Sequence, residues 1–426
     1  MTSTTIDTNQ LSKGNVLIIG GGIAGLCSAY YLLNEGWQVT LLDSGDLQDN
    51  CSYGNAGMLV PSHFTPLAAP GIVAQGIKWM FNSKSPFYVK PSLSANLISW
   101  GLKFVKHANS EHVNRSAPSI RDLNLLSSNL YDEIAKDKGF DFELLHRGIL
   151  MLYKSEKTAE EETHLAHQAQ ALGLDVAVLK KDEVQQLEPH VKLDVLGAVH
   201  YRCDGHLYPQ ALMQQLIAYI KGKGAVILEH TKVTDFEVEG GKIAKVIAGN
   251  QSFKSDKVVM TGGAWLPELA KKVGLKIPLM PGKGYSFMYK PGQHTLQHPS
   301  LLLEARVAVT PMNGHIRFGG TMELAAINSN INMNRVQGIV EAIPQYYPEL
   351  QVDIPEKRDV WFGFRPCSPD GLPYLGESKK IKNLIVAGGC GMMGLSLGPA
   401  VGKVVSELIN EQKLSADISL FAPERF

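Results

Sequence analysis

Hydrophobic residues along the chain recur in short runs that alternate with longer amphipathic segments, a pattern typical of strands followed by helices. The first run, Val16–Ile19, leads directly into a glycine-rich turn and an apolar-periodic segment that reaches about Glu35. Gly36 ends that segment, and the next run is Gln38–Leu42. The pattern therefore predicts a strand, a tight turn, a helix and a second strand at the start of the chain.

The same alternation continues further along. We expect helices over Arg121–Lys138, Ser155–Leu172 and Pro209–Lys221, and strands over Ala225–Leu228, Thr231–Thr234, Lys257–Met260 and Leu384–Ala387. Two antiparallel pairs are predicted by their turns: Phe236–Val238 with Lys242–Ala248 across Glu239-Gly240-Gly241, and Val307–Thr310 with His315–Phe318 around Asn313-Gly314.

These elements predict an α/β fold with two domains. A Rossmann-like nucleotide-binding domain is expected from residues 1–62, 201–283 and 355–426, because a sheet begun by one nucleotide-binding unit needs further strands to bury its faces. A discontinuous α+β substrate domain with an antiparallel sheet is expected from residues 63–200 and 284–354, inserted twice into the first.

Composition narrows the class of partner. The chain has 426 residues, 44% of them hydrophobic, and 41 basic against 41 acidic side chains. Because basic and acidic side chains balance, the net charge gives no indication of a nucleic-acid partner. We therefore expect a small-molecule substrate. Five cysteines, odd in number and widely spaced, fit neither a disulfide framework nor a zinc site, and no metal is expected. A polar N-terminus without an export signal predicts a cytoplasmic protein.

The uncharged segment Leu384–Val401 approaches the length of a membrane span. Five glycines and Pro399 interrupt it. We therefore expect a strand, a glycine loop and a short helix there instead.

The first turn carries the strongest chemical signal. Gly20, Gly22 and Gly25 form a GxGxxG pattern between the first strand and helix, and Asp43 ends the second strand. The glycines allow the turn, the close approach of a pyrophosphate and helix-strand packing, while the carboxylate suits a ribose. A bound dinucleotide is predicted.

Three other motifs have both a chemical and a plain structural interpretation. The loop Ser52–Met58 could offer donors to a bound ring, or be an ordinary asparagine-containing loop. Arg365 lies in the aromatic, proline-rich stretch Trp361–Gly371 and needs an anion, either a substrate carboxylate or an internal Asp or Glu. The loop Gly388–Gly394 could aim a helix dipole at an electron-accepting ring, or be a tight turn.

With these motifs the sequence resembles the flavin-dependent D-amino acid oxidase superfamily, closest to its bacterial D-amino acid dehydrogenase branch of the small-subunit type. The resemblance rests on the glycine motif with Asp43, the SYGNAG loop, the stretch Ala68–Gly71 with Ile77–Met80, the segment Pro281–Ser286, and RPCSPDG before the C-terminal glycine loop.

The resemblance implies FAD, bound non-covalently, in a Rossmann-like domain. Its expected contacts come from the glycine turn, the second strand, the small-residue loop, a mid-chain backbone position and the C-terminal loop: Gly20, Gly22, Ile23, Ala24, Gly25, Asp43, Ser44, Ser52, Asn55, Ala56, Gly57, Met58, Val233, Gly389, Gly391, Met392, Met393 and Gly394. In the family, the residue at the position of Arg365 binds the substrate carboxylate.

The implied reaction is hydride transfer from the α-carbon of an amino acid to flavin N5. The imino acid formed is hydrolysed to a 2-oxo acid and ammonia, whereas D-proline or 4-hydroxy-D-proline would give a cyclic imine. Tyr285 and His63 are further pocket candidates, and each is also a plausible packed core residue. The residues themselves do not distinguish D- from L-amino acids.

Some alternatives stay open. Cys390 stands where relatives often have histidine, and a cysteine attaches the flavin covalently in some sarcosine oxidases of this superfamily. A glycine or sarcosine oxidase that uses O₂, or a non-catalytic flavin-binding subunit, would share the same motifs. A dehydrogenase would pass electrons to a quinone or another carrier, and the segment Ile72–Val105 could then touch the inner face of the cell membrane or instead line the core. No oligomeric state is predicted.

Overall fold

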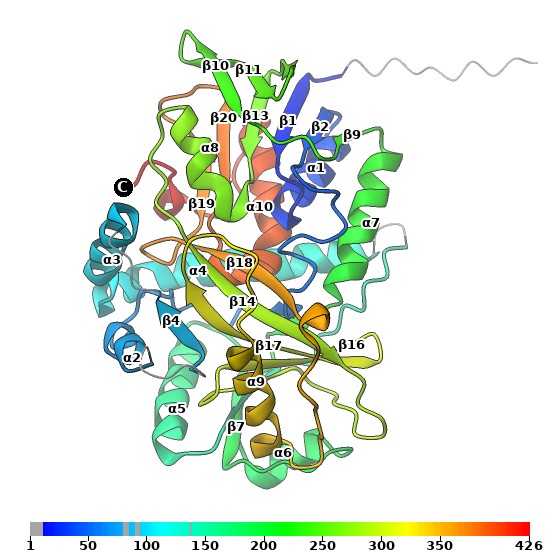
Figure 1. The fold of residues 1–426 in the computed structure, drawn as a ribbon, viewed down its shortest axis with the longest axis vertical. Coiled ribbons are helices and arrows are strands. Elements are labelled where there is room, and N and C mark those ends of the chain that lie inside the picture. Colours follow the sequence, from blue (N-terminus) through cyan, green and yellow to red (C-terminus); the bar gives the residue numbers. More distant parts are fainter. Residues whose placement is uncertain (1–11, 80–84, 90–93, 137–138) are drawn as a thin grey trace, which may run out of the picture.

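The computed structural model describes residues 12–79, 85–89, 94–136 and 139–426. Two sheets organise the chain, one in the upper half of Figure 1 and one in the lower half. The predicted α/β class is confirmed. The residues on which the export-signal prediction rests, 1–11, and the end of the helix predicted to reach Lys138 lie outside the described residues.

The first sheet has six strands in the order β19-β20-β13-β1-β2-β9. Neighbours run parallel except β19 and β20, which are antiparallel. The strands are β1 (Asn15–Ile19), β2 (Gln38–Leu42), β9 (Val226–Leu228), β13 (Lys257–Met260), β19 (Tyr374–Glu377) and β20 (Leu384–Gly388).

Both faces of this sheet are covered, which explains the unbroken apolar run of β1. Val16 and Ile18 pack in one core cluster with α1 (Ile23–Asn34), α7 (Pro209–Gly222) and α10 (Gly394–Ile409). Leu17 and Ile19 pack in another with α8 (Leu266–Lys272) and the small sheet of β10 (Asp235–Glu239), β11 (Lys242–Ala248) and β12 (Gln251–Phe253). Alternate residues of a strand face opposite sides, so a doubly covered strand must be apolar throughout.

The second sheet is mostly antiparallel, with nine strands. Along its main path lie β18 (Trp361–Cys367), β14 (Met280–Tyr289), β17 (His315–Leu324), β16 (Val307–Met312), β15 (Ser300–Leu302), β5 (Ile149–Tyr153), β7 (Gly197–Tyr201) and β6 (Val176–Lys180), with β4 (Phe87–Val89) beside β17. Its core includes α9 (Met333–Tyr346), and α5 (Glu156–Ala171) and α6 (Lys181–Leu187) lie near β6 and β7.

The remaining elements lie outside the strands and helices named so far. They are β3 (Met58–Leu59) paired with β8 (Gly205–His206), α2 (Ile72–Trp79), α3 (Ala95–His107), α4 (Ser110–Lys136), and the 3₁₀ turns η1 (Gly263–Trp265), η2 (Lys357–Asp359), η3 (Gly391–Met393) and η4 (Ser419–Phe421). In Figure 1, α4 crosses the middle of the molecule between the two sheets.

Two details differ from the predicted domain ranges. Strand β18 hydrogen-bonds to β14 in the second sheet, although residues 355–426 are predicted to belong with the first. Helix α4, from the predicted second domain, packs on α10, where the Tyr131 hydroxyl donates to the Leu395 carbonyl at 2.6 Å. The reason for both is that strand pairing and helix packing join segments far apart in sequence. The ranges otherwise stay a prediction.

Both predicted hairpins and the strand over residues 384–387 are confirmed, but Thr231–Thr234 is not a strand. The backbone N–H groups of Thr231 and Thr234 bond to the carbonyls of Asp43 and Ile247, in a loop that joins β9 to β10. Among the described residues one helical stretch, Gly391–Ile409, is long and apolar enough to cross a membrane, and 72% of its most apolar 18 residues are buried within the protein.

Candidate active site

The turn between β1 and α1 is built around two glycines. Gly20 has a φ of +110°, and a Cβ there would lie 2.8 Å from the Thr261 carbonyl oxygen. A Cβ on Gly25 would lie 1.9 Å from the Gly20 carbonyl oxygen. The predicted strand, turn and helix are confirmed, and the glycines are needed because helix and strand approach this closely.

The N-terminus of α1 is suited to an anion. The N-cap residue, Gly22, provides no side-chain cap, and the first turn holds no acidic residue. Gly22 precedes the helix, and the nearest atom to a Cβ added there would be the Ser52 Oγ at 3.7 Å. That Oγ accepts a hydrogen bond from Ile23 N at 3.1 Å. Apart from the Ile23 N–H, which donates to Ser52, the N–H groups at this positive helix end fit the pyrophosphate of a dinucleotide.

Asp43 is fixed at the end of β2. Its two carboxylate oxygens accept from Gly21 N at 2.6 Å and Gly45 N at 2.7 Å. A carboxylate oxygen can accept more than one hydrogen bond, so Asp43 can still receive the hydroxyl groups of a ribose.

The loop Ser52–Met58 is held by the second sheet. Arg317, in β17, donates from Nη1 to the carbonyls of Tyr53 at 3.0 Å and Asn55 at 2.6 Å. Ser286, in β14, donates to the Gly54 carbonyl at 2.9 Å. Burial lowers the pKa of Arg317 to about 10. Sequence reasoning missed Arg317, because its carbonyl partners lie far away in sequence and leave no local signal.

Arg365 extends from β18 across β14. An ideal Cβ on Gly284 would lie 2.0 Å from Nη1 of Arg365, so the guanidinium occupies the space over that glycine. Nη1 donates to the Thr321 carbonyl at 2.6 Å. Burial lowers the pKa of Arg365. Within the described ranges no carboxylate lies within ion-pair distance of it, which favours a ligand carboxylate over the internal acid.

Tyr285 borders the cavity described below, although its side chain is almost fully buried. It is 1% exposed in the core of the second sheet with Phe287 and Phe318. Its hydroxyl donates to Glu323 at 3.1 Å and accepts from Asn332 N at 3.2 Å, and burial raises its pKa to about 12. The alternative interpretation, a packed core residue, fits Tyr285 better than a substrate contact.

The C-terminal loop begins at the end of β20. Gly389 and Gly391 have φ values of +69° and +55°, which favour glycine. Helix α10 follows without a side-chain cap or an acidic residue in its first turn. Cys390 is buried, and burial raises the pKa of its thiol to about 12. At neutral pH it is therefore a thiol, whereas the reactive form of cysteine is the thiolate.

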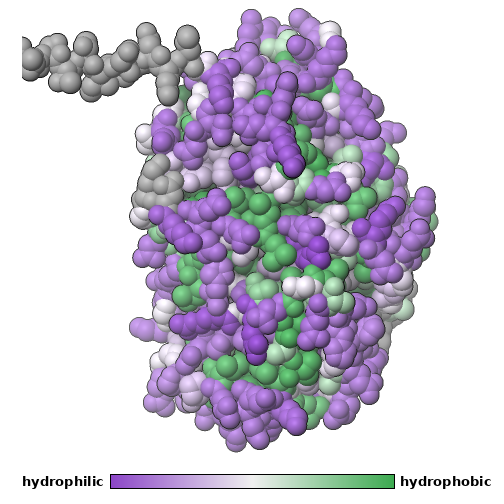
Figure 2. Space-filling view, turned by 180° about the vertical axis from the view of Figure 1, so that it is seen from behind, coloured by the Kyte–Doolittle hydropathy of each residue, from purple (hydrophilic) through white to green (hydrophobic). Residues whose placement is uncertain are grey.

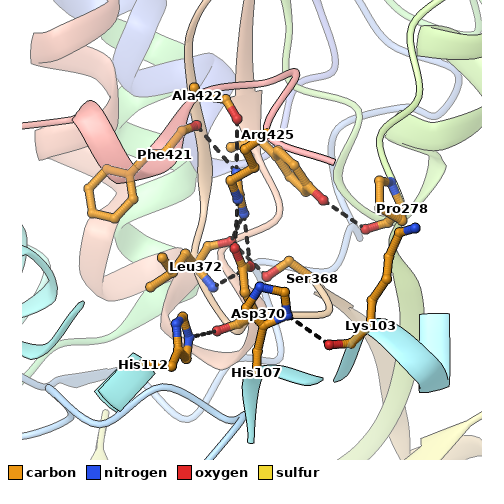
Figure 3. Close-up of polar contacts among 11 residues, drawn as sticks. Lys103, His107, His112, Pro278, Ser368, Asp370, Leu372, Phe421, Ala422 and Arg425 are labelled. Atoms are coloured by element: carbon orange, nitrogen blue, oxygen red, sulfur yellow. Dashed lines mark hydrogen bonds and ion pairs between the residues drawn. The ribbon is translucent and has the colours of Figure 1, made fainter. Parts of the chain in front are cut away.

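The turn that follows Arg365 is held by the C-terminal residues. Arg425 donates to both carboxylate oxygens of Asp370, from Nε at 2.7 Å and Nη2 at 2.9 Å, and its guanidinium lies 3.9 Å from the Tyr374 ring centroid. His112, in α4, bonds to the Asp370 carbonyl at 2.7 Å. Figure 3 shows Arg425 reaching into this turn from the end of the chain. This contact, too, left no sequence signal.

The first glycine turn, Asp43, the loop Ser52–Met58, Arg365 and the C-terminal glycine loop contribute to the wall of one cavity of about 1570 Å³. It exceeds the usual range of about 300–1,000 Å³ for small-molecule pockets, so it has room for a dinucleotide together with a small substrate. Every predicted site residue lines it except Gly25 and Gly57. Gly25 serves helix packing instead, and a Cβ on Gly57 would lie 2.3 Å from the Leu207 carbonyl oxygen, behind the loop.

His63 lines the same cavity from the segment that follows β3. Its Nδ1 lies 3.1 Å from the Ser62 Oγ, which donates to Asp204 at 2.5 Å. The described residues contain no group of three or more His, Cys, Asp or Glu side chains that could hold a metal ion.

Comparisons with known proteins agree with this geometry. The family described as FAD dependent oxidoreductase, DAO, matches residues 15–408. A D-amino acid dehydrogenase of Helicobacter pylori is 31% identical over 415 residues, which cover 96% of this chain and 98% of the relative. A D-amino acid dehydrogenase of Rhizobium rhizogenes is 27% identical over 418 residues, covering 96% and 99%.

Solved structures share the fold. Glycine oxidase from Geobacillus kaustophilus aligns with a TM-score of 0.76 at 23% identity, covering 97% of this chain and 99% of that one. L-proline dehydrogenase from P. horikoshii aligns with a TM-score of 0.73 at 19% identity, covering 97% and 98%.

Proposed function

The chain belongs to the DAO family of FAD dependent oxidoreductases, and from that membership we propose that it oxidises D-amino acids and passes the electrons to a quinone or another carrier. The relatives named D-amino acid dehydrogenase, matched over nearly the whole chain, support the substrate class. D-Proline and 4-hydroxy-D-proline are included in the class that we propose to test.

The residues present fit FAD. The open N-terminus of α1 would hold its pyrophosphate, Asp43 its ribose, and the loop Ser52–Met58 with the start of α10 its ring. When bound, FAD supplies the two-electron acceptor that takes the α-hydrogen of the substrate as hydride. We propose non-covalent attachment, which the buried, protonated thiol of Cys390 supports.

The observation that carries the proposal is the guanidinium of Arg365. It is a cation in the cavity wall without a carboxylate partner within the described ranges, and its planar fork matches a carboxylate. Arg365 would therefore bind and orient the substrate carboxylate. As the α-hydrogen leaves, the lone pair of the substrate nitrogen forms the C=N bond. When the substrate is a primary amine, water then hydrolyses this imino acid to ammonia and the 2-oxo acid.

The experiment is anaerobic reduction of the purified holoenzyme by a panel of D-amino acids, D-proline, 4-hydroxy-D-proline, sarcosine, glycine and the L-amino acids. We expect D-amino acids to bleach the flavin absorbance, and Arg365→Ala to abolish bleaching while FAD stays bound. Bleaching only by glycine or sarcosine, with rapid reoxidation in air, would instead support an oxidase. A yellow protein that no amine bleaches would support a non-catalytic flavin-binding subunit.

One exposed surface on α3 supports the proposal that the electron carrier lies in the membrane. Ile98, Leu102 and Val105 are 50%, 71% and 57% exposed and lie on one helical face, with Lys103 and Lys106 on the same helix. An amphipathic helix with basic residues suits an anionic lipid surface. We propose that the protein is cytoplasmic and binds peripherally to the inner face of the membrane through this surface.

Other parts of the segment predicted to touch a membrane point inward or are not described. Trp100 is 6% exposed and donates from Nε1 to the Cys367 carbonyl at 2.9 Å, so it lines the core. Phe81 lies outside the described residues. Figure 2 shows a rear face on which hydrophobic patches are separated by hydrophilic residues.

Vesicle flotation tests the membrane proposal. We expect binding to anionic vesicles to fall with Leu102→Glu and to persist with Val178→Glu, since Val178 is 43% exposed on β6, outside α3. Equal binding by both variants would contradict it.

A further inference from the structure

A hydrogen-bonded chain leads from a buried carboxylate to the cavity wall. Asp204 is 0% exposed and accepts from Ser62 twice, from the backbone N at 2.9 Å and from Oγ at 2.5 Å. The Oγ of Ser62 also lies 3.1 Å from Nδ1 of His63. Ser62 thus joins a carboxylate that has no access to solvent to an imidazole in the wall of the cavity.

The geometry decides which ring nitrogen of His63 carries the proton. A serine hydroxyl has a single hydrogen. Burial raises the pKa of Asp204 to about 7, so the carboxylate is mostly ionised only above that pH, and the hydrogen of Ser62 then points at it. The same oxygen can then only accept from His63, so Nδ1 carries the hydrogen. Nε2 is left with its lone pair, and within the described ranges it has no hydrogen-bond partner.

His63 keeps this lone pair at neutral pH. Burial, and then the positive charge of Arg306, lower the pKa of His63 to about 4. The imidazole is therefore neutral and offers a hydrogen-bond acceptor. A neutral acceptor in a cavity wall suits a ligand that brings an N–H group.

His63 and Arg365 are connected through the same part of the wall. The segment that starts with Ser62 runs on to Leu67, which packs with Met322 and Cys367. Met322 follows Thr321, whose carbonyl holds the guanidinium of Arg365. His63, Leu67, Met322 and Arg365 all line the one cavity. An amino acid held by its carboxylate at Arg365 would therefore lie in the cavity that His63 also lines.

We propose that Nε2 of His63 accepts a hydrogen bond from the amino group of the substrate, and that Ser62 and Asp204 fix the imidazole in the tautomer that makes this bond. The inference rests on the proposed function, since it takes an amino acid as the ligand. Arg365 and His63 then fix two points of the substrate, the carboxylate and the nitrogen, and so orient the α-carbon between them. Ser62 and Asp204 are positioning residues that act through His63.

The test compares two probes that differ in the amino group, D-alanine and propionate, on the holoenzyme. Anaerobic stopped-flow reduction gives the dissociation constant and limiting rate for D-alanine, and perturbation of the flavin spectrum gives the dissociation constant for propionate. We expect His63→Leu to weaken the binding of D-alanine by about 10- to 100-fold, which is the effect of one lost hydrogen bond to a desolvated donor. Propionate should bind as in the wild type.

Two further variants separate this role from a structural one. His63→Gln supplies a carbonyl oxygen as acceptor and should restore most of the affinity for D-alanine. Ser62→Ala removes the acceptor for Nδ1–H of His63. It should weaken the binding of D-alanine by a smaller factor, again without affecting the binding of propionate. The FAD content of each variant shows whether the cavity is intact, and Ser62→Ala keeps the test open if His63→Leu does not fold.

The outcomes are distinguishable from failure of the proposed function. If D-amino acids reduce the wild type but His63→Leu binds D-alanine unchanged, or loses D-alanine and propionate equally, the assignment of His63 is overturned alone. If no D-amino acid reduces or binds to the wild type, the proposed function fails and the assignment falls with it.

Discussion

The guanidinium of Arg365 lies over Gly284, so close that a Cβ atom on Gly284 would be 2.0 Å from Nη1. The two residues lie on neighbouring strands, β18 and β14, with Gly284 paired to Gly363 and Gly282 paired to Arg365. The absence of a side chain at position 284 is therefore what allows Arg365 to reach the cavity. Gly284 belongs to the substrate site although it offers no functional group.

Gly284→Ala should displace Arg365 without removing it. We expect KM for the amino acid to rise by about 10- to 100-fold, since a misplacement of about 1 Å costs on this order, while FAD stays bound. Steady-state kinetics with the reducing amino acid measure this effect. Gly101→Ala is the matched control, because a Cβ at that helical position meets no atom within 4 Å; an unchanged KM for Gly284→Ala would contradict the predicted role.

Two glycines of the first turn should respond differently to alanine. Gly22→Ala has room in the protein and an extended backbone, so the fold should persist while the methyl group obstructs the pyrophosphate and weakens FAD binding by about 10-fold or more. Gly25→Ala would collide with the Gly20 carbonyl and should destabilise the fold itself.

Circular dichroism melting of the apoprotein and titration with FAD measure the two effects separately. A Gly22→Ala protein that binds FAD as tightly as the wild type would mean that the pyrophosphate does not approach this turn.

Arg317→Met should loosen the loop Ser52–Met58. The substitution leaves the carbonyls of Tyr53 and Asn55 without their buried donor, which costs about 1–3 kcal/mol for each unsatisfied group. We expect weaker FAD binding, measured by equilibrium titration. Ser286→Ala removes only one bond to the same loop and should have a smaller effect; equal FAD affinity in both variants and the wild type would exclude this role for the sheet.

Asp370→Asn should destabilise the holoenzyme in a pH-dependent way. Burial alone would raise the pKa of Asp370, but the hydrogen bonds and charge of Arg425, with the Leu372 N–H and Ser368, hold it below its usual value. A lowered pKa stabilises the fold above the unfolded pKa of about 3.9, and this contribution is lost as the pH falls through the folded pKa.

At pH 7, breaking this buried pair should cost about 3 kcal/mol, or about 3 °C in melting temperature for a chain of this length. The difference from the wild type should persist to about pH 5 and shrink below about pH 4. Melting temperatures at pH 7, 5 and 3.5 check this expectation. Glu161→Gln is the control, because its pair with Lys157 is exposed and worth less than about 1 kcal/mol.

The elements predicted correctly are those whose signals are local. β10 and β11 follow from a glycine turn between two apolar runs, and β1 and α1 follow from the glycine motif. Thr231–Thr234 alternates like a strand, but its N–H groups bond to Asp43 and Ile247 in a loop, and alternation alone does not reveal whether a neighbouring strand is available.

The candidate site divides in the same way. Arg365 was identified by its type and its aromatic surroundings, whereas its lack of an acidic partner within the described ranges required the fold. Tyr285 is a pocket candidate by type, and it does border the cavity, but only the fold shows that its ring also packs in the core of the second sheet. Arg317 and Asp204 were not identified, because their partners are 262 and 142 positions away.

The sequence by itself determined the nucleotide-binding unit and, through its combination of motifs, the family and its cofactor. Those signals work because a βαβ turn specifies its own geometry within a short stretch of chain. Only the tertiary structure decided that Arg365 lies over Gly284, that the Tyr285 ring packs in the core of the second sheet and that Asp204 reaches His63 through Ser62. The physical reason is that these relationships depend on which strands pair and which face of each strand is turned inward, and neither is encoded by neighbouring residues alone.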